Sequence, residues 1–347
     1  MLFKFLLMML LLNSPHSISQ LKVHRSEFVT SYEGELYSDG KVLKAVGLNR
    51  YNLLSVKGSE CGDKFSDLQL EEWFTQAEVK KMKVVRFWAF PLFTAQGTNW
   101  ERFDKVVALA DQHQILLIPT LENHWSDCSD QVKNSDWYKD RYKLSDEGEI
   151  SFSEYAAKVV SRYSESKQIL AWDIVNEPEI AGSDGNEALA KFTNDMVKII
   201  KKEDHNHLVM LGTIGTGQPG SVYRDWQTLL TDVDLASYHD YPLLSNELHQ
   251  PDNPMPGDRW NGLLSRFSMA NRVKVPVIMG EAGINVGQDV ESHWQRAEYL
   301  RSKIKTFFLN GGDVYLIWSG QDAKPRPDGF DVNWDDVLFE QITLPEP

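Results

Sequence analysis

Two glutamates each end an apolar stretch that has the character of a buried strand. Glu177 ends ILAWDIVNE (169–177), and Glu281 ends VPVIMGE (275–281). Burying a carboxylate is costly unless a site uses it. Two carboxyl groups on one face could divide the work of cleaving a glycosidic bond, one protonating the leaving oxygen and the other attacking or activating water. A single glutamate at a strand end is more often a salt-bridge residue, so the hypothesis depends on its neighbours.

Polar and aromatic residues end the other apolar stretches as well. They are Asn49, Arg86, Trp88, Glu122 to Trp125, Asn176, His239, Tyr241 and Trp318. Alone, Arg86 could neutralise a structural carboxylate, and His239 could be a satisfied strand-end histidine. Together with two glutamates they are harder to explain as structural residues.

The elements that must position these residues alternate regularly along the chain. Eight apolar runs lie at 44–49, 84–90, 115–122, 169–177, 207–213, 234–241, 275–281 and 313–319. Amphipathic helical patterns lie between them, at 68–83, 99–114, 151–166, 186–203 and 293–311. Continuous apolar strands that alternate with helices indicate a parallel sheet covered by helices. Eight such units favour a single (β/α)8 TIM barrel over an open doubly wound sheet.

Residues 28–47 precede this pattern and alternate in polarity, with a turn at Asp39-Gly40. We expect an N-terminal β-hairpin there, closing the barrel floor. The carboxyl ends of barrel strands form one face, so the polar residues above should meet in one cleft. No linker or internal repeat divides the chain, which indicates one domain.

The composition limits the class of ligand that this protein is expected to bind. The 347 residues are 42% hydrophobic and 25% charged, as in ordinary globular proteins. The net charge of -14 argues against nucleic acid as a partner. A neutral ligand suits this surface, and eleven Trp with twelve Tyr could stack on sugars or simply fill the core.

The N-terminus resembles a secretory signal. Lys4 precedes eight apolar residues at 5–12, a run too short to span a bilayer. We expect a signal peptide at 1–19, a mature domain at 20–347, and an extracellular protein without a membrane segment. In an oxidising compartment Cys61 and Cys128 could form one disulfide bond, the alternative being two thiols.

Five motifs, in barrel order, resemble those of glycoside hydrolase family 5, the cellulase and mannanase family of retaining (β/α)8 enzymes. WDIVNEPEI (172–180) is similar to its acid/base motif, and VPVIMGEAGI (275–284) to its nucleophile motif. The others are VVRFWAF (84–90), SYHDYP (237–242) and YLIWSG (315–320). The resemblance covers nearly the whole mature chain.

The resemblance implies a role for each matching residue. Glu177 would be the general acid/base and Glu281 the nucleophile, with carboxyl groups about 5 to 5.5 Å apart. The charge of Glu281 is expected to raise the pKa of Glu177. The supporting residues would be Arg86 and Tyr241 beside the nucleophile, Asn176 on the sugar 2-hydroxyl, His239 beside the acid/base, and Trp318 under the sugar.

The stretch ENHW (122–125) departs from the family pattern, in which a His or an Asn-Trp pair is usual. We expect His124 to face the site. Trp125 and Trp88 could form further sugar subsites, or they could pack loops, and the same holds for Phe90, Trp137 and Trp260.

No metal or cofactor is expected. DVNWDD (331–336) lacks the Gly and the later Glu of a calcium loop, and no H-E-x-x-H pattern occurs. The first functional hypothesis is a monomeric endo-β-1,4-mannanase whose partner is mannan, glucomannan or β-glucan. An endo-β-1,4-glucanase (cellulase) or other β-glucanase is the alternative within this class. A barrel that binds carbohydrate without cleaving it is the alternative outside it.

Overall fold

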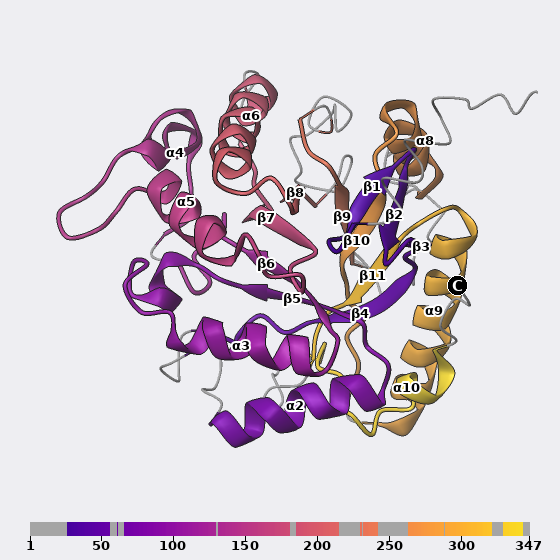
Figure 1. Ribbon diagram of the computed structural model, residues 1–347. Helices are drawn as coiled ribbons and strands as arrows, with labels where there is room; N and C mark the ends of the chain where they lie inside the picture. Colours follow the sequence, from indigo (N-terminus) through magenta and orange to yellow (C-terminus); the bar gives the residue numbers. More distant parts are fainter. Residues whose placement is uncertain are drawn as a thin grey trace, which may run out of the picture.

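The computed structural model describes residues 26–55, 61, 66–129, 131–180, 185–214, 230, 232–241, 263–287, 289–320 and 329–342. Eight parallel strands pair in the order β8-β7-β6-β5-β4-β11-β10-β9 (Figure 1). They are β4 (Ala45–Asn49), β5 (Val84–Trp88), β6 (Leu116–Thr120), β7 (Ala171–Asn176), β8 (Leu208–Gly212), β9 (Ala236–Asp240), β10 (Val277–Ala282) and β11 (Val314–Ile317). A parallel bridge between Met210 and Leu235 joins the two end strands, so the sheet closes into a barrel.

Every residue of β4, β5, β7, β8, β10 and β11 is buried. Side chains on one face of each strand fill the barrel, and those on the other face pack against helices, which explains the unbroken apolar runs. All eight strands predicted from these runs are confirmed, as is the (β/α)8 fold.

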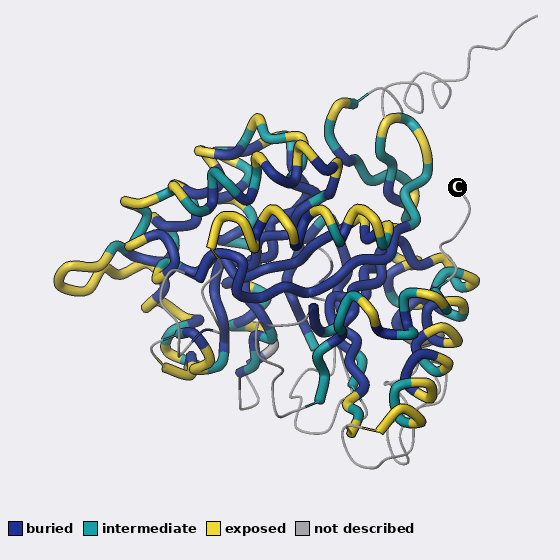
Figure 2. Tube along the Cα trace, turned by 90° about the horizontal axis from the view of Figure 1, so that it is seen from below, coloured by how far each residue is buried: buried dark blue, intermediate teal, exposed yellow. Residues whose placement is uncertain are grey.

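Helices surround the barrel, and exposed residues alternate with buried ones along them, as Figure 2 shows. The bounds are α2 (Asp67–Val79), α3 (Glu101–Gln112), α4 (Ser135–Lys139), α5 (Phe152–Tyr163), α6 (Gly185–Glu203), α8 (Leu263–Val273), α9 (Val290–Leu309) and α10 (Leu338–Gln341). Two 3₁₀ helices are η1 (Pro91–Thr94) and η2 (Arg141–Lys143). The five predicted helices correspond to α2, α3, α5, α6 and α9, whereas α4, α8 and α10 were not predicted.

Two helices begin with a capping box. The Ser66 and Ser151 side chains accept from the backbone N–H groups of Gln69 and Glu154, whose side chains accept in return from the cap backbone. These reciprocal bonds satisfy donors that a helix N-terminus otherwise leaves open, so α2 and α5 start at defined residues.

The segment before the barrel is a three-stranded antiparallel sheet rather than a single hairpin. It contains β1 (Thr30–Tyr32), β2 (Glu35–Ser38) and β3 (Lys41–Val42). Asp39 and Gly40 turn the chain as predicted, with φ of 50° and 76°. A second turn of the same kind, Glu33-Gly34, has φ of 50° and 85°. Two turns with positive φ at both central residues produce three strands.

This small sheet closes the amino-terminal end of the barrel. Leu36 is fully buried in a cluster with the first residues of several barrel strands, among them Val84 and Val314. The Asp313 carboxylate accepts hydrogen bonds from the backbone of Leu36 and of Val277, and it pairs with Lys44 at 3.1 Å. The predicted position at the floor is therefore confirmed.

Within the described residues, none of the helices combines the length and apolarity needed to cross a bilayer. The predicted signal peptide and Trp260 lie outside the described residues.

Candidate active site

The carboxyl ends of the barrel strands bring the predicted site residues together. Arg86 lies in β5, His239 in β9 and Glu281 in β10, while Glu177 directly follows β7. Because all barrel strands run parallel, these positions share one end of the barrel. Arg86 and His239 are fully buried, and Glu281 is 4% exposed.

The Arg86 guanidinium uses all of its five N–H donors. Nη1 donates to Glu281 Oε1 at 2.6 Å and to Asn49 Oδ1 at 3.1 Å. Nη2 donates to Asn176 Oδ1 at 2.7 Å and to Asp173 Oδ2 at 2.8 Å. Nε donates to the same Asp173 oxygen at 2.9 Å. A planar group with five satisfied donors has one orientation, so Arg86 fixes the residues around it.

Two donors hold Glu281. Arg86 bonds its Oε1, and the Tyr241 hydroxyl donates to Oε2 at 2.7 Å. Hydrogen bonds to both oxygens fix the position and orientation of the Glu281 carboxyl group at the base of the site.

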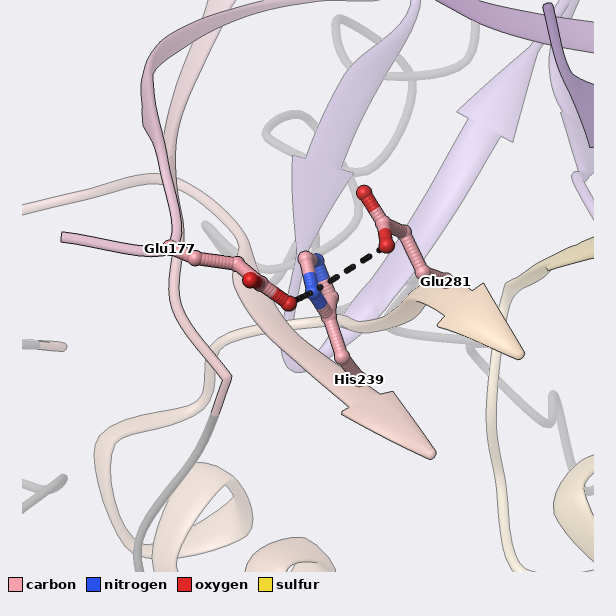
Figure 3. Close-up of side chains that lie close together, drawn as sticks. All are labelled: Glu177, His239 and Glu281. Carbon is pink, nitrogen blue, oxygen red and sulfur yellow. Dashed lines mark hydrogen bonds and ion pairs between the residues drawn. The ribbon is translucent and has the colours of Figure 1, made fainter. Parts of the chain in front are cut away.

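Glu177 sits at a turn with left-handed backbone, φ 48°. Its N–H donates to Gly212 O at 2.7 Å, which anchors the turn to β8. The Trp125 indole N–H donates to Oε2 at 2.7 Å. His239 Nδ1 lies 2.6 Å from Oε1. A dashed line marks this contact in Figure 3. An ionised carboxylate can only accept, so in that state Nδ1 carries the proton between them.

The two glutamates face each other across His239 (Figure 3). His239 Nδ1 is 3.6 Å from Glu281 Oε2, and one oxygen of each glutamate lies within 4.8 Å of the other. That separation is too short for a water beside the sugar, as inversion requires, and is close to the spacing of retaining glycosidases.

The pKa of Glu177 is lowered. Burial raises it, but the hydrogen bonds from His239 and Trp125 and the charge of Arg86 outweigh burial. This direction is opposite to the sequence-based expectation, which considered only the charge of Glu281. The difference arises because His239 donates directly to Glu177.

Aromatic rings line the site beside the carboxylates. Trp318, which follows β11, lies with its ring centroid 5.8 Å from Tyr51 in a stacked arrangement and 6.0 Å from Trp88. Trp88 stacks in turn on Phe90 at 5.2 Å. Only Trp318 of these four is more than slightly exposed, so it can offer a ring face to a ligand, whereas the others support it.

In the stretch ENHW it is Trp125, and not His124 as expected from the sequence, that bonds a carboxylate of the site, that of Glu177. His124 is 5% exposed, its Nδ1 lies 2.9 Å from the Tyr138 hydroxyl, and it accepts from the backbone N–H of Glu179. Burial lowers the pKa of His124 to about 4, so the ring is neutral near pH 7. Its edge meets the Trp125 ring at 4.6 Å, so His124 supports the tryptophan from behind.

Two further predicted groups lie away from the carboxylates. Cys61 and Cys128 are both buried in the main hydrophobic cluster, and their pairing stays a prediction. Trp137 packs on Phe152 and Phe192. The Lys133 ammonium covers its ring at 5.4 Å, which makes Trp137 a packing residue in this arrangement.

Within the described part of the chain, only Glu177, His239 and Glu281 converge closely enough to hold a metal ion. Their four carboxylate oxygens already accept from Arg86, Tyr241, His239 and Trp125. A cation would have to displace these donors beside a guanidinium, so the arrangement fits organic acid–base chemistry better. His205 and His207 have metal-ligand spacing, but both ring nitrogens of His207 are engaged by Asp204 and Ser166 O.

Sequence reasoning missed three residues that shape the site. Asp173 and Thr120 lie beneath Arg86, and Tyr51 stacks on Trp318. Asn123, one of the predicted strand-end residues, accepts from the Asn176 amide at 3.0 Å. A charge at the centre of the apolar run LAWDIV is a signal that could have identified Asp173. No comparable signal marks Tyr51, which lies just beyond a strand.

Comparison with known proteins identifies a matching family and a solved structure with the same fold. The family described as Cellulase (glycosyl hydrolase family 5) matches residues 46–324. The probable mannan endo-1,4-beta-mannosidase A of Aspergillus flavus is 25% identical over 87% of this chain and 82% of its own length. Mannan endo-1,4-beta-mannosidase 8 of rice, Oryza sativa, is 22% identical over 86% of this chain and 92% of its own.

A solved structure of the endo-1,4-beta-mannanase from Rhizomucor miehei superposes with a TM-score of 0.71. The two sequences are 21% identical, and the superposition covers 90% of this chain and 97% of the Rhizomucor miehei chain. At this identity the similarity establishes the barrel fold.

Proposed function

Because this chain belongs to glycosyl hydrolase family 5, we propose that it is a secreted endo-β-1,4-mannanase that retains anomeric configuration. The single observation that carries the chemistry is the pair Glu177 and Glu281, with oxygens within 4.8 Å and His239 between them. The choice of mannan is supported by relatives named as mannan endo-1,4-beta-mannosidases over most of their length.

In the first step Glu281 attacks the anomeric carbon while Glu177 protonates the leaving oxygen. Arg86 and Tyr241 bond both oxygens of Glu281 and hold the carboxylate in one position. The proton comes from the pair formed by Glu177 and His239, which lie 2.6 Å apart. Bond formation to carbon and bond breaking at oxygen leave a glycosyl ester on Glu281.

In the second step Glu177, now ionised, removes a proton from water as that water attacks the glycosyl ester. The proton returns to the pair, and Glu281 is released as the carboxylate. Asn176, whose Oδ1 is held by Arg86 and whose Nδ2 is held by Asn123, presents a fixed amide beside the reacting sugar. Trp318 stacks under the ring at the point of cleavage.

The test is a reducing-sugar assay on mannan, glucomannan, carboxymethyl cellulose and β-1,3-glucan. We expect the highest activity on mannan, and Glu281→Gln should lower kcat by on the order of 10⁴-fold or more while mannan binding persists. Asp204→Asn is the matched control, because that buried carboxylate bonds Trp172 and His207 instead of the site.

Activity only on carboxymethyl cellulose would replace mannan with β-1,4-glucan as the substrate. Binding without hydrolysis on every polysaccharide, in the unaltered protein, would favour the non-catalytic barrel. A Glu281→Gln variant as active as the unaltered protein would refute the mechanism.

A further inference from the structure

A second buried carboxylate lies beneath the catalytic pair. Asp173, in the middle of β7, is completely buried and bonds Arg86 from the side opposite Glu281. Arg86 therefore lies between two carboxylates, with Nε and Nη2 on Asp173 and Nη1 on Glu281. Each anion then experiences the repulsion of the other as well as the attraction of the guanidinium, so the net electrostatic stabilisation of Glu281 is smaller than Arg86 alone would give.

Asp173 accepts its hydrogen bonds through a single oxygen. Oδ2 accepts three of them, two from Arg86 and one from the Thr120 hydroxyl at 2.9 Å. Since two of the three donors belong to Arg86, the carboxylate is coupled to the site mainly through this guanidinium.

The neighbouring strand leaves space for this carboxylate. A Cβ at Gly212, the last residue of β8, would lie 2.7 Å from Oδ2 and 2.8 Å from Oδ1 of Asp173. Any side chain at Gly212 would therefore push the carboxylate against Arg86. Gly212 also accepts the N–H of Glu177, so the same residue positions the acid/base and accommodates Asp173.

We infer that Asp173 is a positioning residue: it fixes the orientation of Arg86 and offsets part of its charge, so that Glu281 is held without being over-stabilised. This role rests on the proposed function of Glu281 as nucleophile. A carboxylate that faces an uncompensated guanidinium attacks more slowly, because the anion is stabilised more than the transition state in which its charge is lost.

The charged and titratable groups around the site come from four strands. They are Arg86 from β5, Asp173 and Glu177 from β7 and its end, His239 and Tyr241 from β9 and its end, and Glu281 from β10. Removing the charge of Asp173 leaves Arg86 acting on Glu177 and Glu281 alone. Without that negative charge Glu177 ionises more easily, so the alkaline limb of the pH–rate profile should move toward acid.

The test compares Asp173→Asn with Asp204→Asn. Asp204 is another buried aspartate, bonded to Trp172 and His207 at the opposite end of the barrel, so its replacement costs stability without touching the site. For Asp173→Asn we expect kcat on mannan to fall about 10- to 100-fold, KM to change less than about threefold, and the alkaline limb of the pH–rate profile to move about 1 pH unit to acid. Asp204→Asn should lower only the melting temperature.

The inference would be overturned by a folded Asp173→Asn variant whose kcat and whose alkaline limb of the pH–rate profile are both unchanged. If that variant does not fold, Thr120→Val provides the test of the inference. This substitution removes one hydrogen-bond donor to Asp173, and Thr120 bonds neither Glu177 nor Glu281. We expect kcat to fall about three- to tenfold with KM retained, and an unchanged kcat would overturn the inference. Failure of the proposed function is distinguishable, because the unaltered protein would then cleave none of the polysaccharides.

Discussion

The hydrogen bond from Trp125 to Glu177 should set the upper pH limit of activity. Trp125→Phe keeps an aromatic ring but removes the N–H that lies 2.7 Å from Glu177 Oε2. That donor stabilises the ionised form of Glu177, and it is one of the causes of the lowered pKa. Its loss raises the pKa, so Glu177 keeps its proton to higher pH and the alkaline limb moves toward base.

The size of the shift follows from the geometry. A hydrogen bond to a charged group contributes about 1.5 to 3 kcal/mol, and one pKa unit corresponds to about 1.4 kcal/mol. The Glu177 side chain is 18% exposed, and His239 and Arg86 still act on it, so water and these groups replace part of the loss. We therefore expect a shift at the lower end, about 1 pH unit.

The assay is kcat/KM on mannan measured across pH. Trp88→Phe is the matched control, since Trp88 packs on Trp318 and Phe90 and has no hydrogen bond to Glu177. Trp88→Phe should raise KM and leave the alkaline limb in place. If the limb of Trp125→Phe stays where it was, or both variants shift it equally, the reasoning fails.

Three further predictions concern stability. Leu36→Ala, in the fully buried floor, should lower the free energy of unfolding by about 2 to 5 kcal/mol in urea without changing kcat, because the floor lies opposite the site; a parallel loss of kcat would contradict this. Burial raises the pKa of Asp313 to about 6, although the charge of Lys44 acts to lower it. The folded protein therefore binds the Asp313 proton more tightly than the unfolded chain does. This proton stabilises the fold fully below about pH 4, and the stabilisation is lost as the pH rises through 6. The difference in unfolding free energy between the unaltered protein and Asp313→Asn should change by about 2 to 3 kcal/mol over that window, and a constant difference would refute it. A Cys61–Cys128 disulfide would add about 4 kcal/mol, so Cys128→Ser and dithiothreitol should each lower the melting temperature; peptide mapping that finds two thiols would exclude the bond.

The barrel could be predicted from the sequence because its strands are buried on both faces. Runs such as LAWDIVN and VPVIMGE have no alternation to confuse the pattern, and the helices between them have a clear apolar face. The position of the N-terminal sheet at the barrel floor was predicted, but its third strand was not. Glu33-Gly34 is a less obvious turn signal than Asp39-Gly40, so only one of the two turns was recognised. The short helix α4 was missed, since five residues carry no measurable periodicity.

The site was predictable where function depends on strand position and not where it depends on side-chain direction. Glu177 and Glu281 end strands, so their meeting follows from the barrel alone. In the loop after β6, the sequence gives no way to know that Trp125 turns toward Glu177 while His124 turns toward Tyr138. The direction of the Glu177 pKa was likewise hidden, because it depends on a 2.6 Å contact with His239.

The left-handed backbone at Glu177 implies a trade between stability and turnover. A residue with a Cβ pays about 1 kcal/mol or more to adopt φ 48°, and the following Pro178 restricts the backbone further. Glycine adopts this conformation freely, so Glu177→Gly should unfold less readily than Glu177→Ala, with no acid/base in either. Selection for thermal resistance alone would therefore favour loss of the residue on which the reaction depends, and directed evolution of this barrel needs an activity screen at every round.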